Sequence, residues 1–405
     1  MIVKKWNSLM PDMVEVHKTY RYRLYRNNKV DGLLHHQINV AGMIWNHALA
    51  LQKRYYKLTG KYIPLDVLKK HIAKLRMRTA KYAYWQALGS QAVQEILERL
   101  DKAYARFFKK DGGFPRFKKV KKFKSFVLKQ AGWDLQDAQE GKKYRKIRIG
   151  KKTYKFIYHR PINGVIKTVI IKRDSAGRLW LCFSVIEKME IPEGISTGKI
   201  GGFDFGLTNF LVTDEGAIIE SPQYYKHDLP RLCAIQSRVS GKVKGSNNHK
   251  AGMWHINRRH IRIADKRLDY HFQLAHDLCD QYDVMVFEDL NLDAMKRLWG
   301  RKISDFGFAQ FVKILDWVAF KRGKRVVKIS RWERTTGKCS GCGHTQKLEL
   351  ADRVFECEGC GNTLGRDHNA AMNILEAGHR LILSQSTEVL ANREAVGVNG
   401  RSPCL

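Results

Sequence analysis

Cys339-Ser-Gly-Cys342 and Cys357-Glu-Gly-Cys360, separated by fourteen residues, decide how this 405-residue chain is interpreted. Each Cys-x-x-Cys loop allows two sulfurs to reach one metal ion. The glycine that follows each loop, Gly343 or Gly361, permits a tight backbone turn. Four cysteines in this spacing are typical of a closed zinc site. The sequence therefore predicts one structural zinc ion, with the ligands Cys339, Cys342, Cys357 and Cys360.

A second motif follows almost immediately, at Arg366-Asp-His-Asn-Ala-Ala-Met-Asn-Ile374. Asp367 lies at the expected start of a helix, and the small residues that follow it allow close packing of that helix. A zinc loop that leads directly into a carboxylate-bearing helix favours a metal-dependent nuclease over a free-standing zinc module.

The charge of the chain indicates a polyanionic partner. Lysine and arginine number 74 and aspartate and glutamate 39, which gives a net charge of +35 and a pI near 9.9. Such a charge repels itself unless a polyanion is bound. The basic residues are mixed with aromatic residues along most of the chain, so we expect a folded nucleic-acid-binding surface rather than a basic tail. The alternative is a basic protein without such a partner.

The other four cysteines, Cys182, Cys233, Cys279 and Cys404, are isolated in the sequence, which suits a reducing compartment. No secretory signal is visible after Lys4 and Lys5, and no run approaches the ~18 apolar residues of a membrane span. We therefore expect a cytosolic protein with no membrane partner.

The N-terminal third combines a strand with helices. Residues 17–26 alternate polar and apolar positions, which predicts a strand with one cationic face. The spacing becomes helical from about residue 30 to residue 109. A second helix is expected after Pro64 and a third from Ser90 to Phe108, with an apolar stripe along one face. These stripes are best interpreted as the packing surfaces of a small helical bundle.

Residues 109–129 combine cations with aromatic rings. Four phenylalanines alternate with six basic residues, and such a stretch can neutralise phosphates and stack on bases. The alternative is an exposed basic loop whose phenylalanines point inward, and both descriptions can hold at once. The predicted nucleic-acid-binding residues are Arg116, Lys118, Lys119, Lys121, Lys122 and Lys124.

Residues 144–188 are predicted to form strands. Val165–Ile171 and Leu179–Ile186 flank a turn at Asp174–Gly177, which indicates a hairpin. With the strand at 17–26, they could close a small barrel that carries the helical region as an insertion. A domain boundary is expected between Pro192 and Gly198.

Two further carboxylates sit in strand contexts. Asp204 lies within a predicted strand that begins at Ile200, and Glu288 ends the apolar run Val284–Phe287. An uninterrupted apolar strand is typical of the centre of a parallel or mixed sheet, whose C-terminal strand ends carry the chemistry. Taken singly, Glu288 or Asp289 could equally cap the next helix. Together, Asp204, Glu288 and Asp367 could hold two Mg²⁺ ions for phosphodiester hydrolysis.

In this order the motifs resemble the TnpB family. Gly202-Phe-Asp204-Phe-Gly206, Val286-Phe-Glu288-Asp-Leu290, the two zinc loops and the Asp367 motif carry the likeness. Gly113–Lys118, Trp45-Asn-His47 and Asp305-Phe-Gly307 also match. TnpB proteins are RNA-guided nucleases of insertion sequences and relatives of compact type V CRISPR effectors. The resemblance covers nearly the whole chain.

The resemblance implies an α+β multidomain fold. A wedge-type β-barrel with an inserted helical recognition bundle comes first, followed by an RNase H-like RuvC α/β domain with an inserted zinc-ribbon module. The expected ranges are 1–29 and 111–197 for the barrel, 30–110 for the bundle, 198–335 and 363–384 for the RuvC-like domain with a bridging helical segment at 249–282, 336–362 for the zinc ribbon, and 385–405 for a disordered tail.

The resemblance also implies the partners and the site. Asp204, Glu288 and Asp367 would be the nuclease carboxylates holding two catalytic Mg²⁺ ions, and the four cysteines would bind zinc. The partners would be a guide RNA derived from the transposon end and a double-stranded DNA target beside a short flanking motif. The location would be the prokaryotic cytoplasm, at the nucleoid. Three alternatives stay open: a compact CRISPR effector, a guide-directed DNA-binding regulator without cleavage, and a true transposase.

Overall fold

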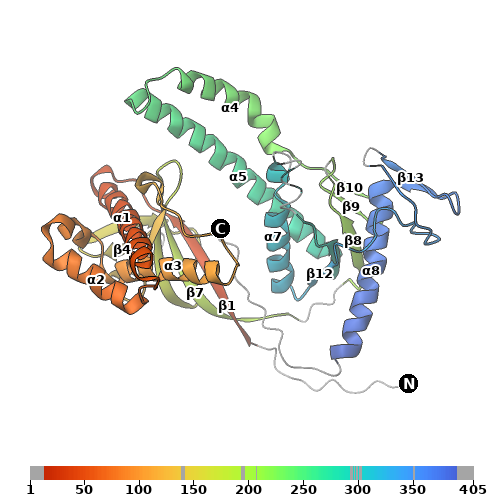
Figure 1. Cartoon of the computed structure of the whole chain (residues 1–405). Helices are drawn as coiled ribbons and strands as arrows, with labels where there is room; N and C mark the ends of the chain where they lie inside the picture. Colours follow the sequence, from red (N-terminus) through yellow and green to blue (C-terminus); the bar gives the residue numbers. More distant parts are fainter. Residues whose placement is uncertain are drawn as a thin grey trace. The chain divides into compact units, whose positions relative to one another are not determined.

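The computed structural model describes residues 13–137, 142–192, 197–206, 208–291, 295, 297, 300, 303–349 and 352–389. These residues form two compact units (Figure 1). The N-terminal unit is formed by Glu15–Lys188, and the C-terminal unit by the described residues from Met189 onwards. Among the described residues, no helix combines the length and apolar character needed to cross a membrane.

Helices build one part of the N-terminal unit. The predicted helix after Pro64 and the predicted helix at Ser90–Phe108 are both confirmed. The apolar stripe of the latter is buried at Ile96, Leu97 and Leu100, because it packs against the first helix and the neighbouring sheet. The helices are α1 (Asn28–Thr59), α2 (Leu65–Arg78) and α3 (Ser90–Phe108), with short 3₁₀ helices at Ala80–Ala87 and Val120–Lys122.

Two antiparallel sheets complete the N-terminal unit. One has the strand order β1-β7-β6-β2 and the other β3-β4-β5. A β-bridge between Leu24 and Phe156 links them, and both contribute to one apolar core with the helices. The predicted hairpin is confirmed as β6 and β7, whereas closure of a barrel stays a prediction. The strands are β1 (Met13–Arg23), β2 (Ser125–Leu128), β3 (Trp133–Leu135), β4 (Tyr144–Ile149), β5 (Lys152–Ile157), β6 (Val165–Arg173) and β7 (Leu179–Glu190).

A mixed five-stranded sheet of order β10-β9-β8-β11-β12 organises the C-terminal unit. The interior strand β11 pairs in parallel with β8 and with β12, which confirms the prediction made from its apolar run. Asp204 is the last residue of β8, so the expected strand ends earlier than the sequence suggested. The strands are β8 (Ile200–Asp204), β9 (Leu211–Thr213), β10 (Ile218–Ile219), β11 (Val284–Glu288) and β12 (Arg325–Ile329).

The two faces of this sheet are covered by different helices. Phe203, Met285 and Phe287 point to one side and pack with residues of α5 and α7. Val286 and Val327 point to the other side and pack against α8. Side chains alternate along a strand, so Asp204 and Glu288 belong to the α8 side. The helices of the unit are α4 (Tyr224–Ser240), α5 (Asn247–Gln281), α7 (Phe308–Lys321) and α8 (Arg366–Val389).

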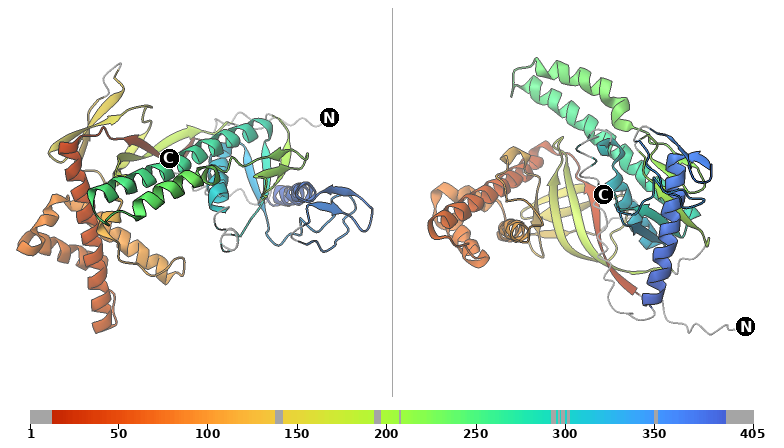
Figure 2. Two further views of the ribbon diagram at one scale, coloured as in Figure 1. Left: turned by 90° about the horizontal axis from the view of Figure 1, so that it is seen from above. Right: turned by 45° about the vertical axis from the view of Figure 1, so that its right-hand side comes forward.

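Helices α4 and α5 form a long antiparallel hairpin, and α8 runs along the sheet with the short strands of the zinc module near its beginning (Figures 1 and 2). These two strands are β13 (Val354–Glu356) and β14 (Thr363–Gly365). The predicted tail at 385–405 needs a correction, because α8 continues to Val389. Extending an existing helix is far easier than nucleating one, so polar residues can prolong it. The rest of that tail lies outside the described residues.

Helix α8 and strand β8 approach each other so closely that a side chain at Gly202 has no room. A Cβ atom there would lie 2.4 Å from the carbonyl oxygen of Ala371 and 2.8 Å from the backbone nitrogen of Leu375. Both neighbours are main-chain atoms of a helix, so they cannot move aside independently.

Replacing Gly202 with alanine is therefore expected to lower the stability of the C-terminal unit by roughly 1–3 kcal/mol, the usual cost of overpacking. Gly241→Ala is the matched control, because its Cβ would meet nothing within 4 Å. Differential scanning calorimetry of both variants checks this. Equal melting temperatures of the two variants would show that α8 can move away from the strand to make room for the added methyl group.

Candidate metal and nucleic-acid sites

Asp204 and Glu288 come together because their strands are adjacent and parallel. The register pairs Phe203 with Phe287, which leaves Asp204 and Glu288 as neighbours one step further along. Each is the last residue of its strand. Both carboxylates therefore lie at the C-terminal edge of the sheet and face α8.

Asp367 reaches the same place from the first turn of α8. Its Oδ2 atom lies 3.4 Å from the position that a Cβ would take on Gly206, just beyond β8. Residues 367, 371 and 375 follow one another at intervals of about one helical turn. Asp367 therefore lies on the same face of α8 as the residues that pack against Gly202. The structure thus brings all three predicted carboxylates to one edge.

Electrostatics reveal how closely the three groups interact. Burial and the negative charges of Asp367 and Glu288 raise the pKa of Asp204 to about 7. Burial also raises the pKa of Glu288. Arg366 opposes this effect at Asp204 and pairs with Asp367 at 3.5 Å. A bound cation would offset the effect of these two negative charges on Asp204.

The neighbouring Asp289 takes a separate role. Its carboxylate forms an ion pair with Arg331, whereas the charge of Glu288 acts on Asp204. The alternative in which Glu288 or Asp289 caps the next helix stays open, because residues 292–302 are mostly outside the described part of the chain.

The four cysteines of the Cys-x-x-Cys loops form a cluster. Their sulfur atoms lie within 4.8 Å of one another, with Cys339 and Cys360 at 3.8 Å and Cys342 and Cys357 at 3.5 Å. A tetrahedral zinc site with Zn–S bonds of 2.3 Å separates its sulfurs by about 3.8 Å, so the cluster fits zinc. Burial raises the pKa of Cys339, but the N–H groups of Cys342 and Gly341 together with the thiols of Cys357 and Cys342 lower it, whereas the same thiols raise the pKa of Cys360. Cys339 is thus the sulfur of the cluster that loses its proton more readily than Cys360.

Two asparagines of α8 fasten the first zinc loop to the helix. The Asn369 side chain donates to the carbonyl of Lys338 at 2.8 Å and accepts from the N–H of Ser340 at 2.9 Å. Asn373 donates to the carbonyls of Thr335 and Lys338 at 2.8 and 2.7 Å. The sequence marked both asparagines as part of a motif but gave no role for them. The contacts show that they satisfy backbone groups of an irregular segment.

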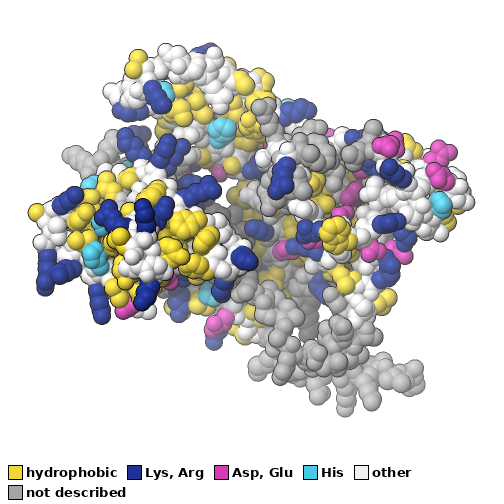
Figure 3. Space-filling view, in the orientation of Figure 1, with side chains coloured by type: hydrophobic (Ala, Val, Ile, Leu, Met, Phe, Trp, Pro, Cys, Tyr) yellow, Lys and Arg dark blue, Asp and Glu magenta, His cyan; other side chains and the backbone are white. Residues whose placement is uncertain are grey.

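The basic stretch at 109–129 fits both predictions, since some of its phenylalanines point inward while its cations are exposed. Phe123 and Phe126 are buried, whereas Phe114 and Phe117 are exposed. Asn46 holds the backbone of Lys118 through two hydrogen bonds, of 2.8 and 2.9 Å. The six predicted residues are exposed on this anchored segment, and Figure 3 shows lysine and arginine side chains spread over the N-terminal unit.

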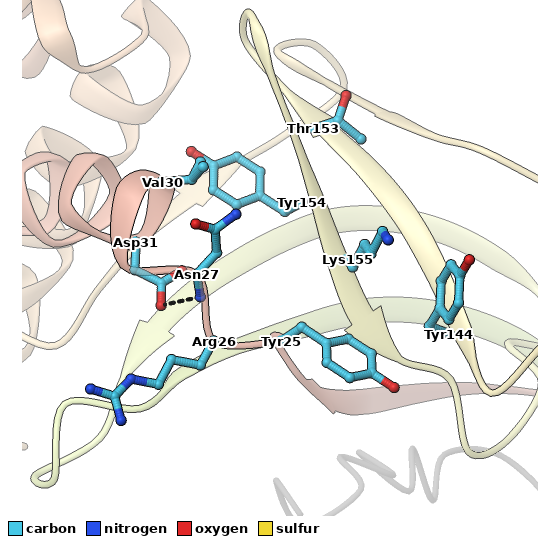
Figure 4. Close-up of a pocket in the computed structure, with 9 residues that line it drawn as sticks. All are labelled: Tyr25, Arg26, Asn27, Val30, Asp31, Tyr144, Thr153, Tyr154 and Lys155. Carbon is cyan, nitrogen blue, oxygen red and sulfur yellow. Dashed lines mark hydrogen bonds between the residues drawn. The ribbon is translucent and has the colours of Figure 1, made fainter.

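A groove of about 1000 Å³ in the N-terminal unit was missed by the sequence analysis (Figure 4). The rings of Tyr25 and Tyr144 meet edge to face at 6.2 Å, and Lys155 lies 4.9 Å from the Tyr144 ring. Aromatic faces beside cations suit single-stranded nucleotides. The lining comes from segments more than a hundred residues apart, so no local pattern marks it. It consists of Tyr25, Arg26, Asn27, Val30, Asp31, Tyr144, Thr153, Tyr154 and Lys155.

The Asp305-Phe-Gly307 segment holds the base of the basic helical hairpin. The Asp305 carboxylate accepts hydrogen bonds from the N–H groups of Tyr225 and Lys226, at 2.9 and 3.1 Å, and so caps α4 from a distant part of the chain. Gly307 has φ +67 at the start of α7, a conformation that favours glycine.

Three family models match the chain. A helix-turn-helix domain model of the OrfB IS605 family matches residues 13–61, the probable transposase model of that family matches 184–298, and the Cas12f1-like TNB domain model matches 308–374. Together they span more than half of the chain. In the structure the first segment contains strand β1 and the single long helix α1.

Curated relatives extend the likeness over almost the full length. Two proteins carry the name "Putative RNA-guided DNA endonuclease". One, from Streptomyces pristinaespiralis, is 28% identical over 90% of each chain. The other, InsQ of Escherichia coli K12, is 27% identical over 84% of this chain and 87% of its own. The TnpB-like protein L79 of Acanthamoeba polyphaga mimivirus is 26% identical over 54% of this chain and 45% of its own.

Together, the family models and the curated relatives support a place for this chain in the TnpB family.

Solved structures agree in fold. This TnpB-family chain superposes on Cas12f1 from a complex with sgRNA and target DNA with a TM-score of 0.57. The identity is 14%, and the match covers 86% of this chain and 83% of that one. The endonuclease Cas_phi3 gives a TM-score of 0.53 at 10% identity, over 91% and 92% of the two chains. At these identities the comparison speaks for the fold alone.

Zinc is expected to be a stability requirement of this TnpB-family protein. Cys357→Ser removes one of the four sulfurs and should lower both the zinc content and the melting temperature, because structural zinc contributes directly to folding. The control is Cys233→Ser, an exposed thiol on α4. Elemental analysis of the reduced protein with calorimetry checks this. Wild-type protein without zinc would contradict it.

The raised pKa of Asp204 predicts a pH-dependent stability. Between about pH 4 and pH 7 the folded protein binds more protons at Asp204 than the unfolded chain, so stability is lost as the pH rises through this window. In Mg²⁺-free buffer at pH 8, Asp204→Asn should be more stable than wild type, by on the order of 1–4 kcal/mol. The difference should vanish near pH 4.

Thermal unfolding at several pH values checks this prediction, with the exposed Asp265→Asn as the control. A constant difference between pH 4 and pH 8 would contradict it.

Proposed function

We propose that this protein is an RNA-guided DNA endonuclease that hydrolyses phosphodiester bonds with Asp204, Glu288 and Asp367. The observation that carries the proposal is the meeting of these carboxylates at one sheet edge, from β8, β11 and the start of α8. The names of the curated relatives support the same activity.

The donor set suits Mg²⁺. Three carboxylates offer hard oxygen ligands, and a divalent cation would offset the burial and the neighbouring negative charges that raise the pKa of Asp204. A pair of Mg²⁺ ions, when bound, would supply an activated water molecule and stabilise the leaving 3′-oxygen. Asp204 and Glu288, positioned by the sheet, and Asp367, positioned by the helix, would hold these ions. The four sulfurs instead suit one structural Zn²⁺.

The partners proposed are a guide RNA, taken from the end of the transposon, and double-stranded target DNA. The net charge of +35 supplies the phosphate neutralisation that both require. We assign part of this role to the anchored segment that carries Arg116, Lys118, Lys119, Lys121, Lys122 and Lys124. A prokaryotic cytoplasmic location, at the nucleoid, follows from these partners.

The proposed domain boundaries follow the family resemblance given above, with a wedge-type barrel, a recognition bundle, a RuvC-like domain and a zinc ribbon. A compact type V effector that uses a separately encoded guide fits the same chemistry. A regulator without cleavage fits less well, because such a protein has no use for three mutually repelling carboxylates.

Single changes of Asp204, Glu288 or Asp367 to alanine should lower guided cleavage more than about 100-fold, because loss of even an outer-shell partner of a metal ligand costs 10–100-fold. RNA-guided DNA binding should persist, since none of these changes removes a cation. Asp265→Ala is the control. Plasmid cleavage and binding are measured with RNA-free protein, with co-purified RNA and with a reprogrammed guide. Sequence-independent cleavage in all three would overturn the guided activity.

A further inference from the structure

A hydrogen-bonded path links the zinc module to Glu288. The hydroxyl of Thr335 donates to Glu288 Oε2 at 3.4 Å. Among the described residues, this is the side chain that donates a hydrogen bond to the Glu288 carboxylate. Thr335 is itself buried, with 4% of its surface exposed, so water does not readily replace it.

The position of Thr335 is fixed by the same helix that carries Asp367. Asn373 of α8 donates to the carbonyls of Thr335 and of Lys338, three residues further on. Asn369, one helical turn earlier, holds Lys338 and Ser340. The two asparagines are 3% and 0% exposed, and a buried amide with fixed partners has little freedom to turn.

The segment from Thr335 to Cys339 is therefore pinned at two ends, by the asparagines of α8 and by the first zinc-binding sulfur. Lys338 adds an ion pair with Glu376 of α8 at 2.8 Å. A glutamate has three rotatable side-chain bonds, and a carboxylate at a strand end needs a partner to keep one orientation. Thr335 provides that partner from a segment that the zinc module anchors.

We propose that Thr335 is a positioning residue, which orients the Glu288 carboxylate for Mg²⁺ and thereby couples the zinc module to the metal site. The inference rests on the proposed function only in taking Glu288 as a Mg²⁺ ligand. It assigns to the zinc module a task beyond its own folding.

Two substitutions separate the effect of the Thr335 hydroxyl from the effect of the packing of its methyl group. Thr335→Val keeps the shape and removes the donor, whereas Thr335→Ser keeps the donor and removes a methyl group. Loss of an outer-shell partner lowers metal affinity by 10–100-fold, so the valine variant should bind Mg²⁺ at least about ten-fold more weakly. The serine variant should stay within about two- to three-fold of wild type, since it retains the hydrogen bond.

The measurement is isothermal titration of Mg²⁺ into the full-length protein with its bound RNA and without DNA. Zinc content, melting temperature and guided DNA binding are recorded on the same samples and should match wild type for both variants. Cleavage as a function of Mg²⁺ concentration should then show the valine defect shrinking at high Mg²⁺.

Each other outcome decides against the inference. Equal Mg²⁺ affinity of the valine variant and wild type would remove the positioning role. An equally weak serine variant, or loss of zinc from the valine variant, would make Thr335 a packing residue. Asp204→Ala, titrated in parallel, tests the proposed function separately. If wild type and this variant bind Mg²⁺ equally, the carboxylate site itself is misplaced.

Discussion

The contact between helix α8 and strand β8 at Gly202 is the constraint on which the C-terminal unit depends. The absence of a side chain allows the helix to lie against the strand backbone at the carbonyl of Ala371. One turn before this contact, Asp367 lies beside Gly206, and its charge acts on Asp204. The adjacent line of the helix presents Asn369 and Asn373 to the zinc loop. One face of α8 therefore carries the carboxylate Asp367, and the adjacent face binds the zinc loop. A shift of this helix would disturb both sites.

Charge separates the carboxylates of the site from those that stabilise the fold. Asp228 pairs with Arg259, and Glu98 pairs with Lys69 and Lys129; in each case these partners lower the pKa of the acid. Asp204 behaves in the opposite way, because burial and the charges of Asp367 and Glu288 raise its pKa. Arg366 is the cation that lowers the pKa of Asp204, and it offsets these effects only in part. Perturbed acids of this kind are typical of functional sites.

The sequence predicted the features that a short stretch can encode. The apolar run Val284–Phe287 identified an interior strand of the sheet, the four cysteines identified the cysteine cluster, and the stripe of Ser90–Phe108 identified a helix. What it missed depends on contacts between distant segments. Asp305 caps a helix that begins eighty residues earlier, and the groove beside Tyr25 needs Tyr144. Thr335 carries no motif of its own, because its role exists only when Glu288 and Asn373 lie on either side of it.

The strand that ends in Glu288 is also tied to the basic helical hairpin. The chain leads from this strand to the Asp305 segment and then into α7, which packs against α5. Within that segment, Asp305 caps α4 and the carbonyl of Ser304 accepts a hydrogen bond of 2.7 Å from Arg267 of α5. Nucleic acid bound along the hairpin would therefore load the same segment that follows the catalytic edge. The hydrogen bonds of Asp305 and Ser304 therefore hold the segment that follows this strand against both helices of the hairpin.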